Sequence, residues 1–227
     1  MEARADRRKT MAYEYVKDWE IRPYRSSCSR TLVKLRDLLN EEYGIITQFS
    51  LVGSGSHSRN LVMRNGNGPF DLDYNIIIIR MPEKYWNNLK LLKDTVRNSL
   101  NRVVRNEFFT DGKDSTSVIT ALLYFKDSPQ VEFSFDIAIL AKNRAGNYCR
   151  LIHDKGFYER FYWNEVPSSC RVMEKADVIK REGCWQEVRD TYEKKKNMYL
   201  TRWDSGNHPS FNIFVETINE VYNKHFY

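Results

Sequence analysis

The sequence has few cysteines and no metal-binding or disulfide pattern among them. Its four cysteines, Cys28, Cys149, Cys170 and Cys184, contain no C-x-x-C pair. Without such a pair, and with nothing that indicates export, free thiols are expected. Cys149 and His153 are four residues apart and could share one face of a helix, but no second ligand pair lies nearby, so a zinc site is not favoured.

The sequence also lacks a segment that would export or anchor the chain. Its longest aliphatic run, Ile76 to Ile79, is far too short to cross a bilayer. Met1 to Tyr15 has charges where the apolar part of a signal peptide would lie. We therefore expect a cytoplasmic protein that does not enter a membrane.

Repeats and low-complexity segments are absent too, and what is present is typical of a globular protein. The 227 residues are 41% hydrophobic and 29% charged, and they include 14 Tyr, 12 Phe and 5 Trp. So many aromatic side chains argue against disorder over most of the chain. The length suits one large domain, or a core with a smaller appended unit.

Positive charge is in modest excess, with a formal net charge of +6. Basic proteins attract phosphate-rich partners, but this excess is spread along the chain, so charge alone does not predict nucleic-acid binding. Residues 1–26 lean basic, with Arg4, Arg7, Arg8 and Lys9 close together. We expect a solvated, partly mobile N-terminal segment there rather than a binding arm.

Hydrophobic periodicity predicts an α+β fold, because helices and strands are mixed in the first two thirds of the chain and helices follow. The expected helices are 27–42, 83–105, 171–200 and 209–224, and the expected strands are 45–52, 70–79, 118–125 and 131–140. We divide the chain into a basic segment 1–26, a core 27–150 and a helical C-terminal unit 151–227.

Two acids lie at the start of the most aliphatic strand, in the run Phe70-Asp71-Leu72-Asp73-Tyr74. Because side chains alternate along a strand, Asp71 and Asp73 project from the same face. Neighbouring carboxylates repel each other and are costly to ionise together unless a cation neutralises them. Hard divalent cations such as Mg²⁺ prefer oxygen ligands, so the pair predicts a metal site. The alternative, two acids at a strand end facing water, stays open.

Other proteins use the D-x-D pattern differently. An EF-hand loop that starts at Asp71 would need glycine and glutamate where this chain has Ile76 and Pro82, so a calcium loop is excluded. Some glycosyltransferases hold Mn²⁺ and a nucleotide-sugar with a D-x-D motif that follows an apolar strand. Here the apolar run follows the acids, which disfavours that class.

A glycine-serine turn, Gly53-Ser54-Gly55-Ser56, follows strand 45–52 and precedes Asp71 in the chain. It has neither the G-K-[ST] end of a P-loop nor the G-x-G-x-x-G spacing of a dinucleotide fold, and such turns are common in loops. Small residues nevertheless let backbone N–H groups approach phosphate oxygens, and a serine hydroxyl adds a donor. Its position ahead of the acids makes this turn a phosphate-binding candidate.

Gly53-Ser54, a spacer and then Asp71-Leu72-Asp73 on a strand resemble the motif of the DNA polymerase β-like nucleotidyltransferase superfamily. That superfamily has a third carboxylate on a later strand. Phe135-Asp136-Ile137 fits this place, well after Asp73 in the chain and bracketed by apolar residues. Glu132 lies on the same predicted strand face but nearer the strand start, which makes it the weaker candidate.

The resemblance covers about residues 30 to 140. The spacer between Gly53 and Asp71 is longer than usual, and Asn65-Gly66-Asn67-Gly68 has the character of an insertion. The spacer residues Ser56, Ser58, Arg59 and Asn60 distantly resemble cyclic-dinucleotide and oligoadenylate synthases, but they do not assign the branch.

The resemblance implies a mixed β-sheet core with flanking helices and a two-metal mechanism. Asp71 and Asp73 would hold two Mg²⁺ ions, with Mn²⁺ as the alternative. Asp136 would complete one metal site and assist deprotonation of the attacking hydroxyl. The turn, through Gly53, Ser54, Gly55 and Ser56, would bind the phosphates of an NTP such as ATP, and Arg59 is a further nucleotide-binding candidate.

Other side chains are weaker candidates. Arg59 and Arg64 could reach phosphate, but a solvated cation is the simpler interpretation of each. His57, next to the turn, could donate to phosphate, and a surface histidine is an equal alternative. In the superfamily a C-terminal helical unit often closes over the nucleotide and stacks an aromatic ring on its base. A lysine run on a helix is usually a solvated face, yet the last third of the chain offers side chains of both kinds: Tyr192, Lys194, Lys195, Lys196, Tyr199 and Trp203.

The sequence therefore predicts a nucleotidyltransferase that moves a nucleoside monophosphate from an NTP to an acceptor hydroxyl and releases pyrophosphate. The acceptor could be a small molecule, another nucleotide, an RNA end or a protein. No nucleic-acid-binding module is evident, which favours the first two. Two alternatives stay open: a catalytically silent nucleotide-binding or regulatory module, and a partner in a toxin–antitoxin pair that binds through the helices of 171–227.

Overall fold

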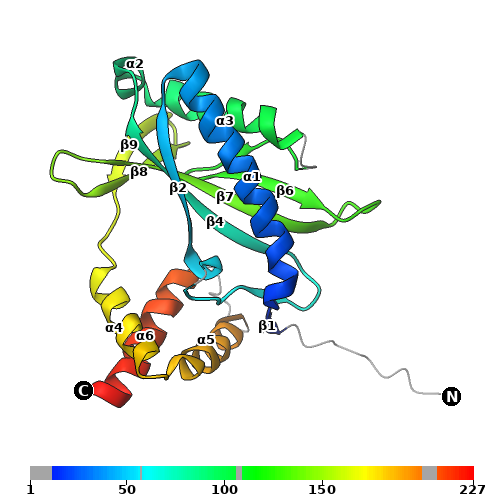
Figure 1. Ribbon diagram of the computed structural model, residues 1–227, viewed down its shortest axis with the longest axis vertical. Helices are drawn as coiled ribbons and strands as arrows, with labels where there is room; N and C mark the ends of the chain where they lie inside the picture. Colours follow the sequence, from blue (N-terminus) through cyan, green and yellow to red (C-terminus); the bar gives the residue numbers. More distant parts are fainter. Residues whose placement is uncertain (1–11, 57, 106–108, 201–208) are drawn as a thin grey trace. The chain divides into compact units, whose positions relative to one another are not determined.

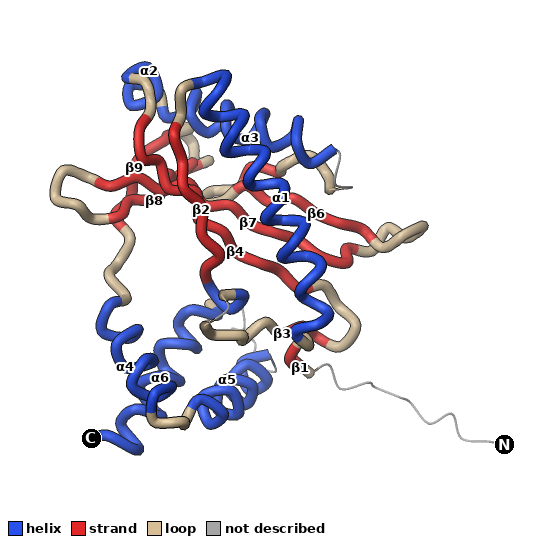
Figure 2. Tube along the Cα trace, viewed as in Figure 1, coloured by secondary structure: helices blue, strands red, loops and turns tan. Residues whose placement is uncertain are grey.

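The computed structural model describes residues 12–56, 58–105, 109–200 and 209–227. These residues form two compact units, whose helices and strands are drawn in Figures 1 and 2. The sheet unit comprises Val16–Val62 and Pro69–Ser169. The helical unit comprises β1 (Tyr13–Tyr15), the segment Met63–Gly68 and the described part of Cys170–Tyr227.

A seven-stranded mixed sheet forms the sheet unit. The strands are β2 (Ile46–Val52), β4 (Phe70–Arg80), β5 (Lys113–Asp114), β6 (Ile119–Tyr124), β7 (Val131–Lys142), β8 (Tyr148–Asp154) and β9 (Arg160–Glu165). They run in the order β2-β4-β7-β6-β5, with β8 also paired to β7 and β9 paired to β8. β4 and β7 are parallel, and the other pairs in this sheet are antiparallel. The predicted α+β class with a mixed sheet and flanking helices is confirmed.

One face of this sheet is buried beneath two helices, α1 (Asp18–Tyr43) and α3 (Leu89–Val104). Along β4, buried residues alternate with more exposed ones from Phe70 to Ile78, so the even-numbered side chains enter the core. The core is aliphatic and aromatic, and its members include Leu32, Leu35, Leu39, Leu72, Tyr74, Leu92, Val96, Leu100, Phe133 and Phe135. The odd-numbered side chains of β4 and the even-numbered side chains of β7 lie on the opposite face, which we call the acidic face.

The first helix begins earlier than the sequence predicted. α1 starts at Asp18 and not near residue 27, although Pro23 lies inside it. Ile21, Arg25 and Cys28 are buried along α1, and this burial outweighs the backbone N–H that proline lacks. Residues 18–26, predicted as a solvated basic segment, are therefore part of the folded sheet unit. Arg4, Arg7, Arg8 and Lys9 lie outside the described residues.

The helix predicted over 83–105 is divided in two. α2 (Glu83–Asn87) ends before Asn88, and α3 begins after it. The Asn88 side chain accepts a hydrogen bond from the backbone N–H of Leu91 at 2.9 Å, so it caps the start of α3. Leu92, Val96, Leu100 and Val103 of α3 are buried.

Two strands, β8 and β9, occupy most of residues 151–165, whereas the sequence predicted the start of a helical unit there. β8 pairs with the end of β7, and β9 pairs with β8 in a hairpin. Their aromatic and branched residues suit a pleated surface, and the exposed edge of β7 supplies the backbone partners. Cys149 and His153 consequently lie on one face of a strand, not of a helix. The helices begin only at Cys170.

The helical unit packs α4 (Cys170–Arg181), α5 (Trp185–Leu200) and α6 (Ser210–Phe226) with the antiparallel pair of β1 and β3 (Met63–Asn65). Phe214, Ile218 and Val221 of α6 are buried, as the periodicity predicted, whereas Phe211 is exposed. Asn197 of α5 holds β1 by accepting from the Tyr13 backbone N–H at 2.6 Å. No helix in the described part of the chain is long and apolar enough to cross a membrane.

A buried ion pair joins α3 to the edge of the sheet. The Nζ of Lys93 lies 2.6 Å from Oδ1 of Asp114, and the two side chains are only 3% and 13% exposed. His153 bridges two carboxylates, with Nδ1 2.5 Å from Asp114 and Nε2 2.7 Å from Glu159. Removing one partner of such a pair leaves the other charge buried without compensation.

Replacing Lys93 with methionine is expected to lower the free energy of unfolding by about 3 kcal/mol, because Asp114 loses its buried cation. Equilibrium denaturant unfolding measures this change. The matched control is Lys90→Met on the same helix. Lys90 is half exposed and forms a surface pair with Asp94 at 3.5 Å, so its loss should cost less than about 1 kcal/mol. Equal effects of the two substitutions would contradict the assignment.

Candidate active site

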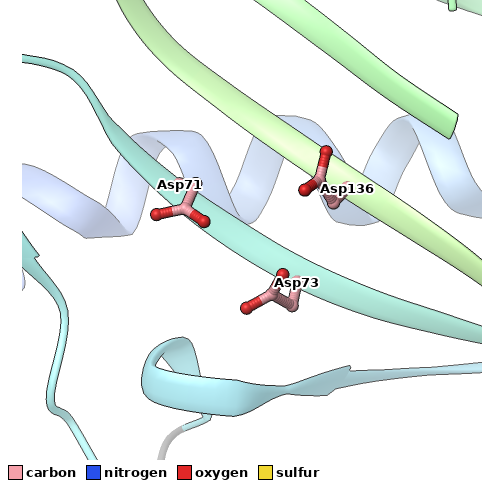
Figure 3. A group of neighbouring side chains, drawn as sticks. All are labelled: Asp71, Asp73 and Asp136. Atoms are coloured by element: carbon pink, nitrogen blue, oxygen red, sulfur yellow. The ribbon is translucent and has the colours of Figure 1, made fainter. Parts of the chain in front are cut away.

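Three aspartates meet on the acidic face of the sheet. β4 presents Asp71 and Asp73, and its parallel neighbour β7 presents Asp136 directly opposite Asp73. Figure 3 shows the three carboxylates close together on the two strands. One ligand oxygen of each lies within 4.8 Å of the others. Among the described residues, no other group of three His, Cys, Asp or Glu side chains is so placed.

Burial and the repulsion between neighbouring carboxylates raise the pKa values of Asp73 and Asp136. Burial, followed by the negative charges of Asp71 and Asp136, raises the pKa of Asp73 to about 7, and the positive charge of Arg150 opposes the shift. Burial also raises the pKa of Asp136, although a hydrogen bond from Thr120 opposes this. Three oxygen ligands that resist ionising together are a donor set that fits a hard divalent cation.

Thr120 on β6 positions the third acid. It lies opposite Asp136 in the antiparallel pairing of β6 with β7, and its hydroxyl donates to Asp136 Oδ1 at 2.5 Å. The sequence predicted both strands but not this contact. The partner of Asp136 depends on the register of the β6–β7 hairpin, which the residues of the strands alone do not define. Such donors orient metal-binding carboxylates and hold them ionised.

The glycine-serine turn lies against Asp73. It forms a short 3-10 helix, η1 (Gly53–Gly55), after the last residue of β2, Val52, which pairs with Asp73. Gly53 has a φ of +64°, and a Cβ built on it would lie 2.6 Å from Asp73 Oδ2. A Cβ on Gly55 would lie 2.4 Å from Leu72 Cδ2. Both positions therefore require glycine if the turn is to lie this close to β4.

Two arginines hold the turn in place. Arg25 of α1 is buried, forms an ion pair with Asp18 at 2.7 Å and donates to the carbonyl of Gly55 at 3.2 Å. Arg59, a predicted nucleotide-binding residue, donates to the carbonyl of Gly53 at 3.4 Å. The sequence did not predict the contact of Arg25 with the turn, because Arg25 lies far from the turn in the chain and in a segment expected to be solvated.

The remaining residues of the turn differ in their contacts. The Ser54 carbonyl accepts from the backbone N–H of Leu61 at 2.9 Å, which closes the loop after the turn. The Ser56 hydroxyl is buried and has no hydrogen-bond partner among the residues that the structure describes. His57, which follows it, lies outside them.

Two weaker candidates are engaged elsewhere. Glu132 is not part of the acidic cluster and accepts a hydrogen bond from the Tyr24 hydroxyl. Arg64 lies on β3 in the helical unit, where its Nε is 3.6 Å from Glu14. These contacts give both side chains a structural role.

The candidate side chains of the C-terminal helices contact other residues of the helical unit. Tyr192 is buried, and Lys195 lies 2.9 Å from Glu220. Lys196 donates to Ser210 at 2.8 Å, and Tyr199 donates to Glu216 at 3.1 Å. Lys194 is exposed, and Trp203 lies outside the described residues. Contacts such as these hold the C-terminal helices together.

Comparison with solved structures identifies the fold. A structure of Vibrio cholerae DncV cyclic AMP-GMP synthase, described as a prokaryotic cGAS homolog, superposes with a TM-score of 0.58 at 14% identity, over 93% of this chain and 68% of that one. The same enzyme in complex with the linear intermediate 5′ pppA(3′,5′)pG gives 0.60 at 15% identity, over 93% and 68%. A variant of it with two aspartates replaced by alanine gives 0.61 at 14% identity, over 91% and 69%.

These similarities show that the chain has the nucleotidyltransferase fold of the DncV structures, as the sequence motif predicted. At this level of identity they establish the fold alone. No protein-family profile matches the chain, and no curated protein matches it.

The raised pKa of Asp73 makes a prediction about stability. The folded protein holds a proton on Asp73 that the unfolded chain releases at lower pH. The stability that the folded state gains from this proton is therefore complete below about pH 4 and is lost as the pH rises to about 7. Asp73→Asn removes the buried charge. At pH 8 without metal, the variant should melt a few degrees above the wild type, and at pH 4 this advantage should disappear.

Differential scanning fluorimetry with and without MnCl₂ measures both effects. Mn²⁺ should raise the melting temperature of the wild type at pH 8, because it binds the folded state. Asp73→Asn should respond much less. A variant that is less stable than the metal-free wild type at pH 8 would refute the proposed repulsion.

Thr120 provides a second test. Thr120→Val keeps the side-chain shape but removes the donor to Asp136, so the affinity for Mn²⁺ should fall about tenfold or more. Thr120→Ser keeps the hydroxyl and should bind Mn²⁺ almost as the wild type does. Titration followed by electron paramagnetic resonance counts free Mn²⁺ directly. Equal losses in both variants would indicate a packing role instead.

Proposed function

We propose that this protein is a metal-dependent nucleotidyltransferase, which moves a nucleoside monophosphate from an NTP to an acceptor hydroxyl and releases pyrophosphate. One observation carries the proposal: Asp71, Asp73 and Asp136 are gathered on one face of a nucleotidyltransferase-type sheet, directly beside the Gly53–Gly55 turn. The motif, the fold and the geometry of the acids support the same chemistry.

The acids are suited to hold Mg²⁺, or Mn²⁺ in its place. Asp71 and Asp73 reach the site from one strand, and Asp136 reaches it from the next. Divalent cations held there would neutralise phosphate charge and lower the pKa of the attacking hydroxyl. Asp136, oriented by Thr120, is placed to accept the proton of that hydroxyl.

The turn is suited to hold the triphosphate. Gly53 and Gly55 keep side chains away from Asp73 and Leu72, so an anion can approach the backbone closely. Arg59 and Arg25 fix the carbonyls of the turn, and Ser54 and Ser56 add hydroxyl groups. These groups orient the phosphates, and orientation with electrostatic stabilisation accounts for most of phosphoryl-transfer catalysis.

A nucleotide is the acceptor that we favour. The similar DncV enzyme is named a cyclic AMP-GMP synthase and has been crystallised with a linear dinucleotide intermediate. Similarity of fold supports a nucleotide acceptor here over a nucleic-acid end, a protein or an antibiotic. The proposal leaves the choice of base open.

Incubation of the purified protein with Mg²⁺ and each labelled NTP, alone and in pairs, tests the proposal, with products resolved by mass spectrometry. We expect pyrophosphate and a nucleotide adduct, and at least about a hundredfold loss of rate in Asp73→Asn and Asp136→Asn. Asp127→Asn is the control: it removes the same charge from a turn residue with a φ of +61°, which asparagine tolerates.

Three outcomes would change the assignment. Pyrophosphate release that survives Asp73→Ala would exclude the acidic cluster as the catalytic site. NTP binding by calorimetry without turnover would favour a silent nucleotide-binding module. The absence of any NTP binding by the wild type would exclude both functions.

A further inference from the structure

Arg150 lies on the same face of the sheet as the three acids. It is on β8, opposite Leu140 of β7. Leu140 is four residues after Asp136 on the same strand, so the side chains of Arg150, Leu140 and Asp136 point to the same side of the sheet. The residue between them on that face is Ala138. Its small side chain leaves the way from Arg150 to the acids free of a large β7 side chain.

The charge of Arg150 acts on the acidic cluster. Its positive charge lowers the pKa of Asp73, against the larger effects of burial and of the charges of Asp71 and Asp136. The guanidinium therefore lies within electrostatic reach of a proposed metal ligand. The phosphate-binding turn follows β2, and β2 and β8 lie on opposite sides of the β4–β7 pair. Arg150 thus approaches the cluster from the side away from the turn.

Arg150 has no close partner of its own among the described residues. The side chain is partly buried, and its Nε is buried without a hydrogen-bond partner in that part of the chain. Two other arginines of the sheet unit do pair with acids: Arg25 with Asp18 at 2.7 Å and Arg102 with Glu42 at 2.5 Å. A partly buried donor without an acceptor is costly, and it is expected where a ligand supplies the acceptor.

We propose that Arg150 is a further substrate-binding residue, whose guanidinium binds a phosphate oxygen of the nucleotide held at Asp71, Asp73 and Asp136. The proposal rests on the proposed function. A planar guanidinium offers paired donors that match phosphate geometry, and such bonds are stronger than those between neutral groups. The phosphate belongs either to the donor NTP or to a nucleotide acceptor.

This role predicts effects of opposite sign on two ligands. A cation that arrives alone is repelled by Arg150, whereas an anionic nucleotide is attracted to it. Arg150→Gln should therefore bind Mn²⁺ alone about two- to threefold more tightly, because a positive charge near Asp73 is gone. If the bound phosphate is that of the donor, Arg150→Gln should bind a nonhydrolysable NTP with saturating Mg²⁺ about tenfold or more weakly. A purely structural role would weaken both.

Two further variants keep the result interpretable. Arg150→Lys retains the charge but not the paired donors, so Mn²⁺ affinity should stay at the wild-type value while nucleotide affinity falls. Arg80→Gln removes the same charge from the exposed end of β4 and should leave both affinities unchanged. Melting temperatures of all the variants show whether they fold. If Arg150→Gln does not fold, the nucleotide affinity of Arg150→Lys tests the proposal instead.

The source of the phosphate follows from two measurements. If it belongs to the donor, binding of the nonhydrolysable NTP weakens. If it belongs to the acceptor, that binding is unchanged, and Arg150→Gln instead raises KM for an acceptor nucleotide but not for the same nucleoside without phosphate. Wild-type values in both measurements, with normal NTP binding by the wild-type protein, would overturn the role of Arg150 and leave the proposed function intact. Failure of the wild type to bind any NTP would refute the function itself.

Discussion

The repulsion among Asp71, Asp73 and Asp136 is the constraint on which the rest of the sheet unit depends. Carboxylates this close, two of them partly buried, cannot all be ionised without compensation. The folded chain compensates a small part of this negative charge, through the hydroxyl of Thr120 and the positive charge of Arg150. What is left uncompensated is a local instability, which a bound divalent cation would relieve. The core on the opposite face has to supply the stability that this cluster removes.

Strands hold the acids more rigidly than loops would. Asp73 and Asp136 are far apart in the chain, yet the parallel ladder of β4 and β7 sets them side by side. A slip of one residue in either strand would turn its acids into the core and bring a large apolar side chain to the acidic face. Phe133 and Phe135 on the buried face of β7 prevent such a slip. The packing of one face thus determines the geometry of the other.

Much of this could be predicted from the sequence, because the relevant patterns are local. Alternation in β4 put Asp71 and Asp73 on one face, and the apolar neighbours of Asp136 put it on a later strand. What could not be predicted depends on partners distant in the chain. Arg25 is buried because α1 continues past Pro23, and β8 and β9 are strands because β7 offers them an edge. Thr120 and Arg150 acquire their roles only through register.

The long spacer between the turn and the acids illustrates the same distinction. Its length exceeds what is usual for this motif. Gly53 nevertheless lies against Asp73, because the pairing of β2 with β4 brings the two residues together. Val52 pairs with Asp73 in the antiparallel ladder of β2 and β4, so the next residue, Gly53, must lie against the Asp73 carboxylate. The segment Met63–Gly68, which contains the insertion predicted at Asn65–Gly68, belongs to the helical unit. The segment Met63–Gly68 could therefore vary in length without separating Gly53 from Asp73, as long as the two strands keep their register and residue 53 remains glycine.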